Sequence, residues 1–188
     1  MSKFYLASRS PRRSILLSKL TTEFELIDVE VDETPRINES PSEYVLRISL
    51  EKAMQARQNL SSSIPVLSAD TEVVCNNNIL GKPNTLAEAI DMLMSLSKRE
   101  HVVYTAVTLL TETHNQLLNS SRVWFRNIDK IECEDYIKKF MPLDKAGAYG
   151  IQDQAARFIT RFEGSYSGVM GLPLSDTVRL LTILNINS

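Results

Sequence analysis

Short runs of strand-forming residues alternate along this chain with segments that carry helix-start signals. Two of these starts are capping boxes, in which a Ser or Thr at the N-cap precedes a Glu by three residues. Strands are predicted at 4–7, around 24–31, at 66–75 with a partial return at 79–80, at 102–110, near 122–125 and at 158–162. Helices are predicted from Pro11, over 41–58 and 86–96, after Asp129 and from Pro173. This alternation predicts a mixed α/β fold.

Length and charge limit the remaining possibilities. With 188 residues and 43% hydrophobic composition, the chain can bury a core without a disulfide or a metal. One compact domain over 1–188 is therefore expected. The 21 basic and 23 acidic residues give a net charge of −2, which argues against a surface that binds a nucleic acid polymer. A small phosphate ligand needs only a local basic pocket.

Cysteine and histidine are too few to form a metal site of their own. Cys75 and Cys133 are far apart, and His101 and His114 have no metal-ligand spacing, so any bound metal is expected to be held by oxygen. No stretch approaches 18 apolar residues, and the first residues lead directly into a strand-like run. We expect a protein of the reducing cytoplasm, without a membrane segment.

The segment 8–13 places Arg12 and Arg13 in the first turn of a predicted helix, after the N-cap candidate Ser10. The helix dipole favours negative charge at this end, so paired cations there cost up to about 1 kcal/mol each. A bound phosphate would reverse that cost. The alternative is that both arginines point to solvent.

A carboxylate, Asp70, lies inside the apolar strand predicted at 66–75. Asp is disfavoured in strands, and a buried carboxylate needs a hydrogen bond, a shifted pKa or a cation. Lys82 follows the next turn, so a structural Asp–Lys pair is the plain alternative. Lys52 falls on the same helix stripe as Val45 and Ile48, where its ammonium can reach phosphate or simply water.

Two glycine-containing segments complete the set of candidate binding elements. Segment 144–152 combines glycines with a tyrosine and with Gln152, whose amide can read the edge of a base. Segment 164–173 is a Gly/Ser-rich loop that can cradle an anion with backbone N–H groups. Gly81-Lys82-Pro83 lacks the remaining residues of a P-loop, which excludes a Walker-type ATPase.

Taken in order, segments 6–13, 68–71, 80–83, 144–152 and 164–174 resemble the Maf family over nearly the whole chain. The resemblance implies an α/β fold with a mixed twisted sheet flanked by helices, and two lobes with a central substrate cleft, similar to the inosine triphosphatases. It implies hydrolysis of a nucleoside triphosphate to the monophosphate and pyrophosphate. It also allows a homodimer.

The resemblance assigns roles to individual residues. Asp70 matches the family's catalytic base and, with Glu33, a site for Mg²⁺ or Mn²⁺. The specificity positions match Arg12, Thr71 and Gln152, and the phosphate-binding positions match Ser8, Arg12, Arg13, Lys52 and Lys82. Whether Asp70 acts as general base or through the metal stays open, because both roles need the same carboxylate in the same cleft.

The chain resembles the dTTP/UTP branch of the family rather than the branch that acts on 7-methyl-GTP. The similarity lies in Arg12, in Thr71 and in the amino-acid sequence of segment 144–152. Modified pyrimidine triphosphates are further candidate substrates. Two alternatives stand beside this reading. One is a house-cleaning pyrophosphatase for other non-standard nucleotides, such as 7-methyl-GTP or ITP. The other is a nucleotide-sensing regulator of cell division, although a pure sensor has no need of a base.

Overall fold

A twisted mixed sheet organises the fold. The computed structural model describes residues 4–60 and 63–184, in which the sheet has seven strands. They are β1 (Phe4–Ala7), β2 (Phe24–Ile27), β3 (Val66–Cys75), β4 (Asn78–Ile79), β5 (Glu100–Leu110), β6 (His114–Phe125) and β7 (Ile159–Glu163). The strand order is β2-β1-β3-β5-β6-β7, and β4 pairs with the end of β3. β1 runs parallel to β2 and β3, whereas the remaining pairs are antiparallel.

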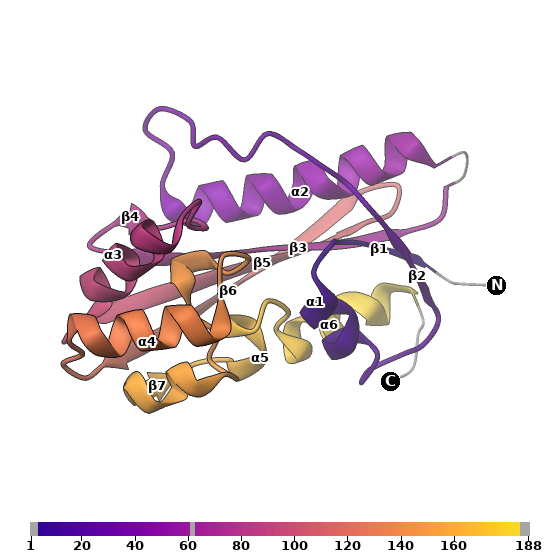
Figure 1. Cartoon of the computed structure of the whole chain (residues 1–188). Coiled ribbons are helices and arrows are strands. Elements are labelled where there is room, and N and C mark those ends of the chain that lie inside the picture. The colour runs from indigo at the N-terminus through magenta and orange to yellow at the C-terminus, as the bar shows by residue number, and fades with distance from the viewer. Residues whose placement is uncertain (1–3, 61–62, 185–188) are drawn as a thin grey trace.

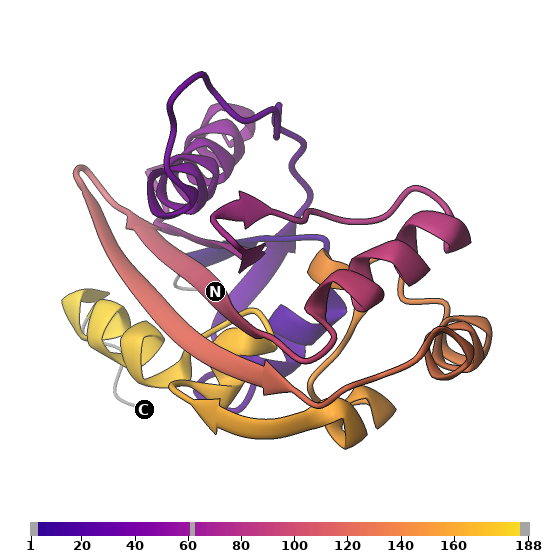
Figure 2. The ribbon, with the colours of Figure 1, turned by 90° about the vertical axis from the view of Figure 1, so that its left-hand side faces the viewer.

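Helices cover both faces of this sheet (Figures 1 and 2). They are α1 (Pro11–Leu17), α2 (Pro41–Asn59), α3 (Leu86–Leu96), α4 (Lys130–Phe140), α5 (Tyr166–Val169) and α6 (Leu174–Leu181), with 3₁₀ turns η1 (Ala146–Ala148), η2 (Gln154–Phe158) and η3 (Thr182–Leu184). The long helix α2 lies along one face, α1 and α6 lie on the other, and α3 and α4 pack together at one end. The expected mixed α/β architecture is confirmed.

The capping box predicted at Ser40 is confirmed. Ser40 accepts a hydrogen bond from the backbone N–H of Glu43, whose side chain returns a bond to the backbone N–H of Ser40. The box predicted at Thr85 forms only in part: Thr85 accepts from the N–H of Glu88, but the Glu88 side chain accepts from the N–H of Asn84 and not from that of Thr85. Each cap satisfies an N–H group that would otherwise lack a partner, which fixes where the helix begins.

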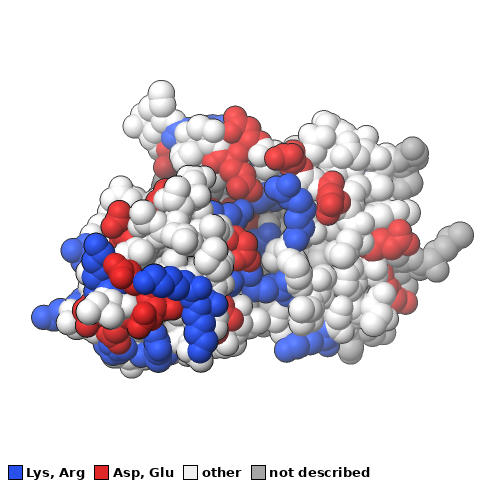
Figure 3. Space-filling view, viewed as in Figure 1, with Lys and Arg blue, Asp and Glu red and all other residues white. Residues whose placement is uncertain are grey.

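Two large apolar clusters give the molecule two lobes. The first lies between the sheet and α3 and α4, and its largest fully buried side chains include Leu93, Leu96, Tyr136, Ile137 and Phe158. The second lies under α1 and α6 and includes Phe4, Leu6, Leu17, Leu67 and Leu109. The surface between the two ends is hollowed, and Lys and Arg side chains gather in the hollow (Figure 3). The sheet passes beneath it, so strand residues form its floor.

The expected strand around 24–31 is partly wrong. β2 ends at Ile27 because its partner β1 ends at Ala7, the residue in register with Ile27. Val29 is still buried, but it packs against the α2 side of the core instead of continuing the sheet. The chain from 28 onward is free to cross toward the hollow.

β6 is longer than the strand predicted near 122–125, since it begins at His114. Its first half is polar and partly exposed, and pairing with β5 from Leu110↔His114 onward supplies the order that local propensity lacks. Across residues 4–60 and 63–184, the structure has no helix that is long and apolar enough to cross a membrane.

Candidate active site

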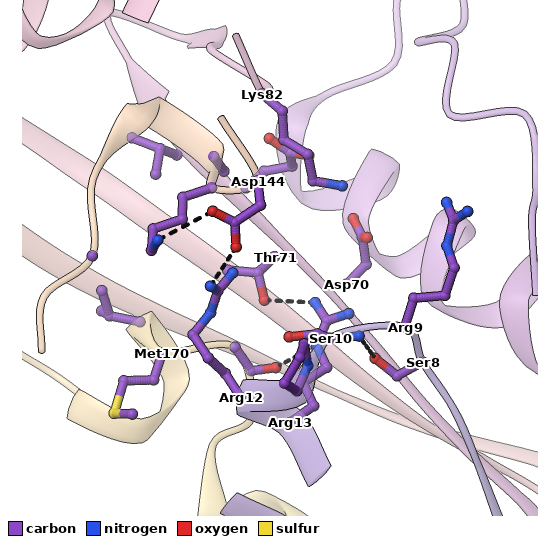
Figure 4. Close-up of a pocket in the computed structure, with 18 of the residues that line it drawn as sticks. Ser8, Arg9, Ser10, Arg12, Arg13, Asp70, Thr71, Lys82, Asp144 and Met170 are labelled. Atoms are coloured by element: carbon purple, nitrogen blue, oxygen red, sulfur yellow. Dashed lines mark hydrogen bonds and ion pairs between the residues drawn. The ribbon is translucent and has the colours of Figure 1, made fainter. Parts of the chain in front are cut away.

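A cavity of about 420 Å³ lies in the hollow between the two lobes. It is lined by every residue to which the sequence analysis gave a role in the site: Ser8, Arg12, Arg13, Glu33, Lys52, Asp70, Thr71, Lys82 and Gln152. These residues come from the β1–α1 turn, the first turn of α1, the crossing after β2, helix α2, strand β3, the turn after β4 and the segment between η1 and η2. The fold therefore brings the separate motifs into one site (Figure 4).

The start of α1 faces this cavity with its first turn uncapped. Ser10 is at the N-cap position, but its side chain makes no capping hydrogen bond. Its backbone N–H instead donates to Oγ of Ser8 at 3.1 Å, which holds the β1–α1 turn closed. The N–H groups of a first turn attract anions, so the uncapped turn adds to the attraction that the nearby arginines exert.

Arg13 is tied into the site rather than pointing to solvent, which overturns the alternative for this residue. Its Nε donates to the carbonyl oxygen of Gly171 at 2.9 Å, and its Nη2 donates to Oγ1 of Thr71 at 3.2 Å. Gly171 has φ +116°, and a Cβ there would stand 3.4 Å from Nε of Arg13. Burial lowers the pKa of Arg13, while the charge of Asp70 partly opposes that effect.

Arg12 reaches across the opening of the cavity. Its Nη1 donates to Oδ2 of Asp144 at 2.7 Å, and the other oxygen of Asp144 accepts from Nζ of Lys145 at 3.1 Å (Figure 4). Although burial opposes it, the hydrogen bond from Arg12 lowers the pKa of Asp144. Arg12 thus links α1 to the segment that carries Gln152.

Asp70 lies on the floor of the cavity, and Lys52 is its partner. Nζ of Lys52 lies 2.7 Å from Oδ1 of Asp70 and 2.7 Å from Oε1 of Glu33. The sequence analysis offered a structural pair of Asp70 with Lys82, and this pairing is wrong in the structure. Nζ of Lys82 lies 3.8 Å from Oε2 of Glu33, and the Lys82 side chain is 54% exposed. Oδ2 of Asp70 is buried and has no hydrogen-bond partner among the described residues, so one carboxylate oxygen remains available.

Thr71 faces the other side of β3. Its hydroxyl receives hydrogen bonds from Arg13 and, at 3.1 Å, from Oγ1 of Thr105 on the neighbouring strand. The amide of Gln152, by contrast, makes no hydrogen bond to any residue that the structure describes, and its side chain is exposed at the cavity wall. Gln152 is the freer of the two to meet a base.

The segment 144–152 is held in place by contacts with both neighbouring elements. The N–H of Gly147 donates to the carbonyl oxygen of Gly81 at 2.8 Å, next to Lys82. The hydroxyl of Tyr149 lies 2.7 Å from Nε2 of His101, and both side chains are buried. Burial lowers the pKa of His101 to about 3 and raises the pKa of Tyr149. These contacts fix the wall that presents Gln152.

Sequence reasoning gave no individual role to Asp144, Lys145 and Tyr149, although they lie in the candidate segment 144–152, and it gave none to Glu72. Glu72 carries the same signal as Asp70, since it is a second carboxylate inside the apolar strand and shares a face with Asp70 two residues away. It is only 6% exposed, and no hydrogen bond or ion pair reaches it from the described residues. Burial, and then the charge of Asp70, raise the pKa of Glu72 to about 8.

The donor atoms around Asp70 suit a hard divalent cation. Mg²⁺ in nucleotide enzymes is typically held by one or two carboxylates together with phosphate oxygens and water. Asp70 offers the unpartnered Oδ2, and the carboxylate of Glu33 lies at the same wall. Within the described part of the chain, no three acidic, His or Cys side chains form a complete ligand set, so phosphate and water would have to supply the remaining ligands.

Comparison with known proteins shows the family of this chain. The family model described as "Maf-like protein" matches residues 3–184, and the chain belongs to the Maf family. A dTTP/UTP pyrophosphatase of Pasteurella multocida (strain Pm70) is 45% identical over 188 residues, which cover 95% of this chain and 94% of that protein. A dTTP/UTP pyrophosphatase of Vibrio vulnificus (strain YJ016) is 44% identical and covers 96% and 98%.

Among solved structures, the Ham1 protein of Staphylococcus aureus matches with a TM-score of 0.49 and 10% sequence identity, over 65% of this chain and 71% of that one.

Proposed function

We propose that this protein hydrolyses dTTP and UTP to the monophosphate and pyrophosphate. One observation carries the proposal: Asp70 lies on the cavity floor with one oxygen held by Lys52 and the other free, while Arg12, Arg13 and Lys82 line the walls. A triphosphate needs such cations, and its hydrolysis needs a fixed carboxylate. The two relatives named dTTP/UTP pyrophosphatase support the choice of substrate.

The proposed reaction is the attack of water on the α-phosphorus. Asp70 acts through Oδ2 in one of two roles, as the base that accepts the water proton or as a ligand that would hold the metal ion, and in both the bond to Lys52 keeps its carboxylate oriented. The guanidinium of Arg13, fixed by Gly171 and Thr71, stabilises negative charge that develops on the leaving pyrophosphate. Lys82 supplies a further positive charge, and its exposed side chain can change conformation to contact the phosphates.

We propose Asp70 and Glu33 as residues that would hold Mg²⁺ or Mn²⁺. When bound, such an ion supplies Lewis-acid neutralisation of the phosphate oxygens. The ammonium group of Lys52 already contacts both of these carboxylates, so Lys52 would lie close to a bound ion. Its positive charge would contribute to phosphate binding on the same wall of the cavity.

Base recognition is proposed to fall to the wall formed by Arg12, Thr71 and Gln152. Arg12 is restrained by Asp144, and Thr71 is restrained by Arg13, so these two act mainly by shaping the wall. Gln152 carries a free donor and acceptor that a pyrimidine edge can use. The overall charge of −2 supports a free nucleotide rather than a nucleic acid polymer as ligand.

A substrate panel tests the proposal. The purified protein is supplied with Mg²⁺ or Mn²⁺ and with dTTP, UTP, CTP, ITP and 7-methyl-GTP, and the release of pyrophosphate and monophosphate is measured. We expect the highest kcat/KM with dTTP and UTP. A preference for ITP or 7-methyl-GTP would favour the house-cleaning alternative. Tight nucleotide binding without any turnover would favour a nucleotide sensor.

A further inference from the structure

Glu72 is a buried carboxylate without a partner. No hydrogen bond or ion pair reaches it from residues 4–60 or 63–184, and its Oε2 is inaccessible to solvent. Leaving a buried carboxylate unsatisfied is costly, because its charged form loses hydration and gains nothing in return. A buried carboxyl group avoids this cost either by keeping its proton or by binding a cation.

The position of Glu72 favours a bound cation. Successive side chains of a strand alternate between faces, so Asp70 and Glu72 project from the same face of β3, the face that α2 covers. Asp70 also has a buried oxygen without a partner, Oδ2. Lys52 satisfies only Oδ1 of Asp70, so Oδ2 of Asp70 and the carboxylate of Glu72 lie near each other without a cation among the described residues to separate their charges. A cation bound between or beside them would offset that repulsion.

Glu72 also lies on the wall that two cavities share. It lines the main cavity of about 420 Å³ and a smaller one of about 300 Å³ behind it, together with Glu33 and Lys82 in both cases. A ligand bound to Glu72 is therefore adjacent to the proposed triphosphate. The charges of Lys82 and Lys52 both act on Glu72, but the structure pairs Lys82 with Glu33, and Lys52 with Glu33 and Asp70, and neither with Glu72.

We propose that Glu72 is a direct ligand of a divalent cation of the Mg²⁺ or Mn²⁺ type at the wall beside Asp70. Carboxylate oxygen is the donor that these hard ions prefer, and one or two carboxylates with phosphate and water complete a usual coordination sphere. The inference rests on the proposed function for the identity of the phosphate ligand. The binding of the cation itself requires no substrate.

The test measures metal binding and stability without turnover. Mn²⁺ is titrated into wild type and into Glu72→Gln, and the free ion is followed by its electron paramagnetic resonance signal. Glu134→Gln, on α4 and outside both cavities, is the matched control for loss of one carboxylate. We expect Glu72→Gln to weaken Mn²⁺ binding by about ten-fold or more, the order found when residues of a metal site are replaced. The control is expected to bind as the wild type does.

The stability of the metal-free protein distinguishes a Glu72 that has no partner from a Glu72 that forms an ion pair in solution. If Glu72 is unpartnered, Glu72→Gln raises or preserves the urea midpoint without metal and removes the increase that Mn²⁺ produces in wild type. A lower metal-free midpoint would show that Glu72 pairs with Lys82 in solution, and unchanged Mn²⁺ affinity would show that Glu72 is no ligand. Either result overturns the inference.

A measurement on the wild type alone keeps the inference testable if Glu72→Gln does not fold. In a ¹⁵N-labelled sample, bound Mn²⁺ should broaden the amide signals of Glu72 and Val73 at low stoichiometry, before it affects those of β7. Uniform broadening across the sheet would overturn the inference. Because none of these readouts involves hydrolysis, failure of the cation site and failure of the proposed dTTP/UTP activity are separate results.

Discussion

Nζ of Lys52 lies 2.7 Å from Oδ1 of Asp70, and the side chain of Lys52 is only 12% exposed. The pair forms between the middle of α2 and the middle of β3, the two elements that pack along the length of the fold. One oxygen of Asp70 is thereby committed to orientation, which leaves Oδ2 for chemistry. In the proposed mechanism the same contact serves stability and activity, and substitutions can separate these two contributions.

Asp70→Asn is expected to lower kcat for dTTP by about 10² to 10⁴, the contribution of a positioned general base. The fold should persist, because the amide oxygen of Asn can still accept the hydrogen bond from Lys52. Initial-rate kinetics and a urea unfolding curve on the same preparation check both statements. A folded Asp70→Asn protein with near-normal turnover would contradict the role given to Asp70.

Lys52→Met and Lys82→Met should differ in stability although both should lower kcat/KM. Removing Lys52 leaves the buried Asp70 without its partner, which is expected to lower the free energy of unfolding by about 3 kcal/mol or more. Lys82 forms only a long, exposed contact with Glu33, so its removal should cost less than about 1 kcal/mol. Equal destabilisation by both variants would contradict this account of the site.

Metal dependence can be measured separately from folding. Hydrolysis of dTTP should stop in EDTA and return with Mg²⁺ or Mn²⁺, because the proposed metal ligands are carboxylates that need an ion to neutralise the triphosphate. Without nucleotide the protein should stay folded in EDTA and lose only the increase in the midpoint that a bound Mg²⁺ or Mn²⁺ adds, since Cys75 and Cys133 are free and buried and hold no structural metal with each other. Loss of the folded state in EDTA would contradict the assignment.

Much of the fold could be predicted because its helix starts are local signals. A capping box such as that at Ser40 needs only residues a few positions apart, so the sequence alone places the start of α2. The end of β2 depends instead on where β1 ends, and the first half of β6 depends on β5, which are tertiary facts. Local propensity carries no information about such partners.

The site could be predicted where a residue type is unusual for its element. Asp70 in an apolar strand and Arg13 in the first turn of a helix are both visible without a structure. The pairing of Asp70 with Lys52 is not, because it depends on the placement of α2 over β3. Glu72 was detectable by the rule that singled out Asp70, and what the structure adds is the absence of any partner among the described residues.

The buried His101 should make stability pH-dependent. Its pKa falls from 6.5 to about 3 because burial excludes the imidazolium, and Tyr149 and the edge of Phe125 are the groups that meet its ring. The unfolded chain therefore takes up a proton below about pH 6.5 that the folded protein refuses. The stability that neutral His101 contributes is present in full above that pH and is lost as pH falls toward 3.

Denaturant unfolding of wild type and His101→Gln between pH 7 and pH 4.5 measures this contribution. The difference in unfolding free energy should shrink by about 1.4 kcal/mol for each pH unit below 6. His114→Gln, at an exposed position in β6, is the control for loss of a histidine. A difference between wild type and His101→Gln that does not vary with pH would show that His101 is protonated in the folded protein.

Selectivity among bases should depend on Gln152 more than on the cations. In the proposed mechanism Asp70, Arg13, Lys52 and Lys82 act on the triphosphate, which all candidate substrates share. The amide of Gln152, by contrast, lines the cavity without a partner in the described chain. A wrong base leaves such a donor or acceptor unpaired, which costs about 1 to 3 kcal/mol per group.

Gln152→Ala removes the amide that is proposed to recognise the base, and it should bring the kcat/KM values for dTTP, UTP, CTP and GTP closer together. Gln154→Ala is the matched control, because it removes the same amide two residues away at an exposed position that does not line the cavity. Thr71→Val should act differently, since the Thr71 hydroxyl receives the bond from Arg13 and its loss disturbs a phosphate-binding cation. We expect Thr71→Val to lower kcat/KM for all four substrates, with smaller changes in their ratios. If Gln152→Ala lowers all four values by one common factor, Gln152 does not read the base.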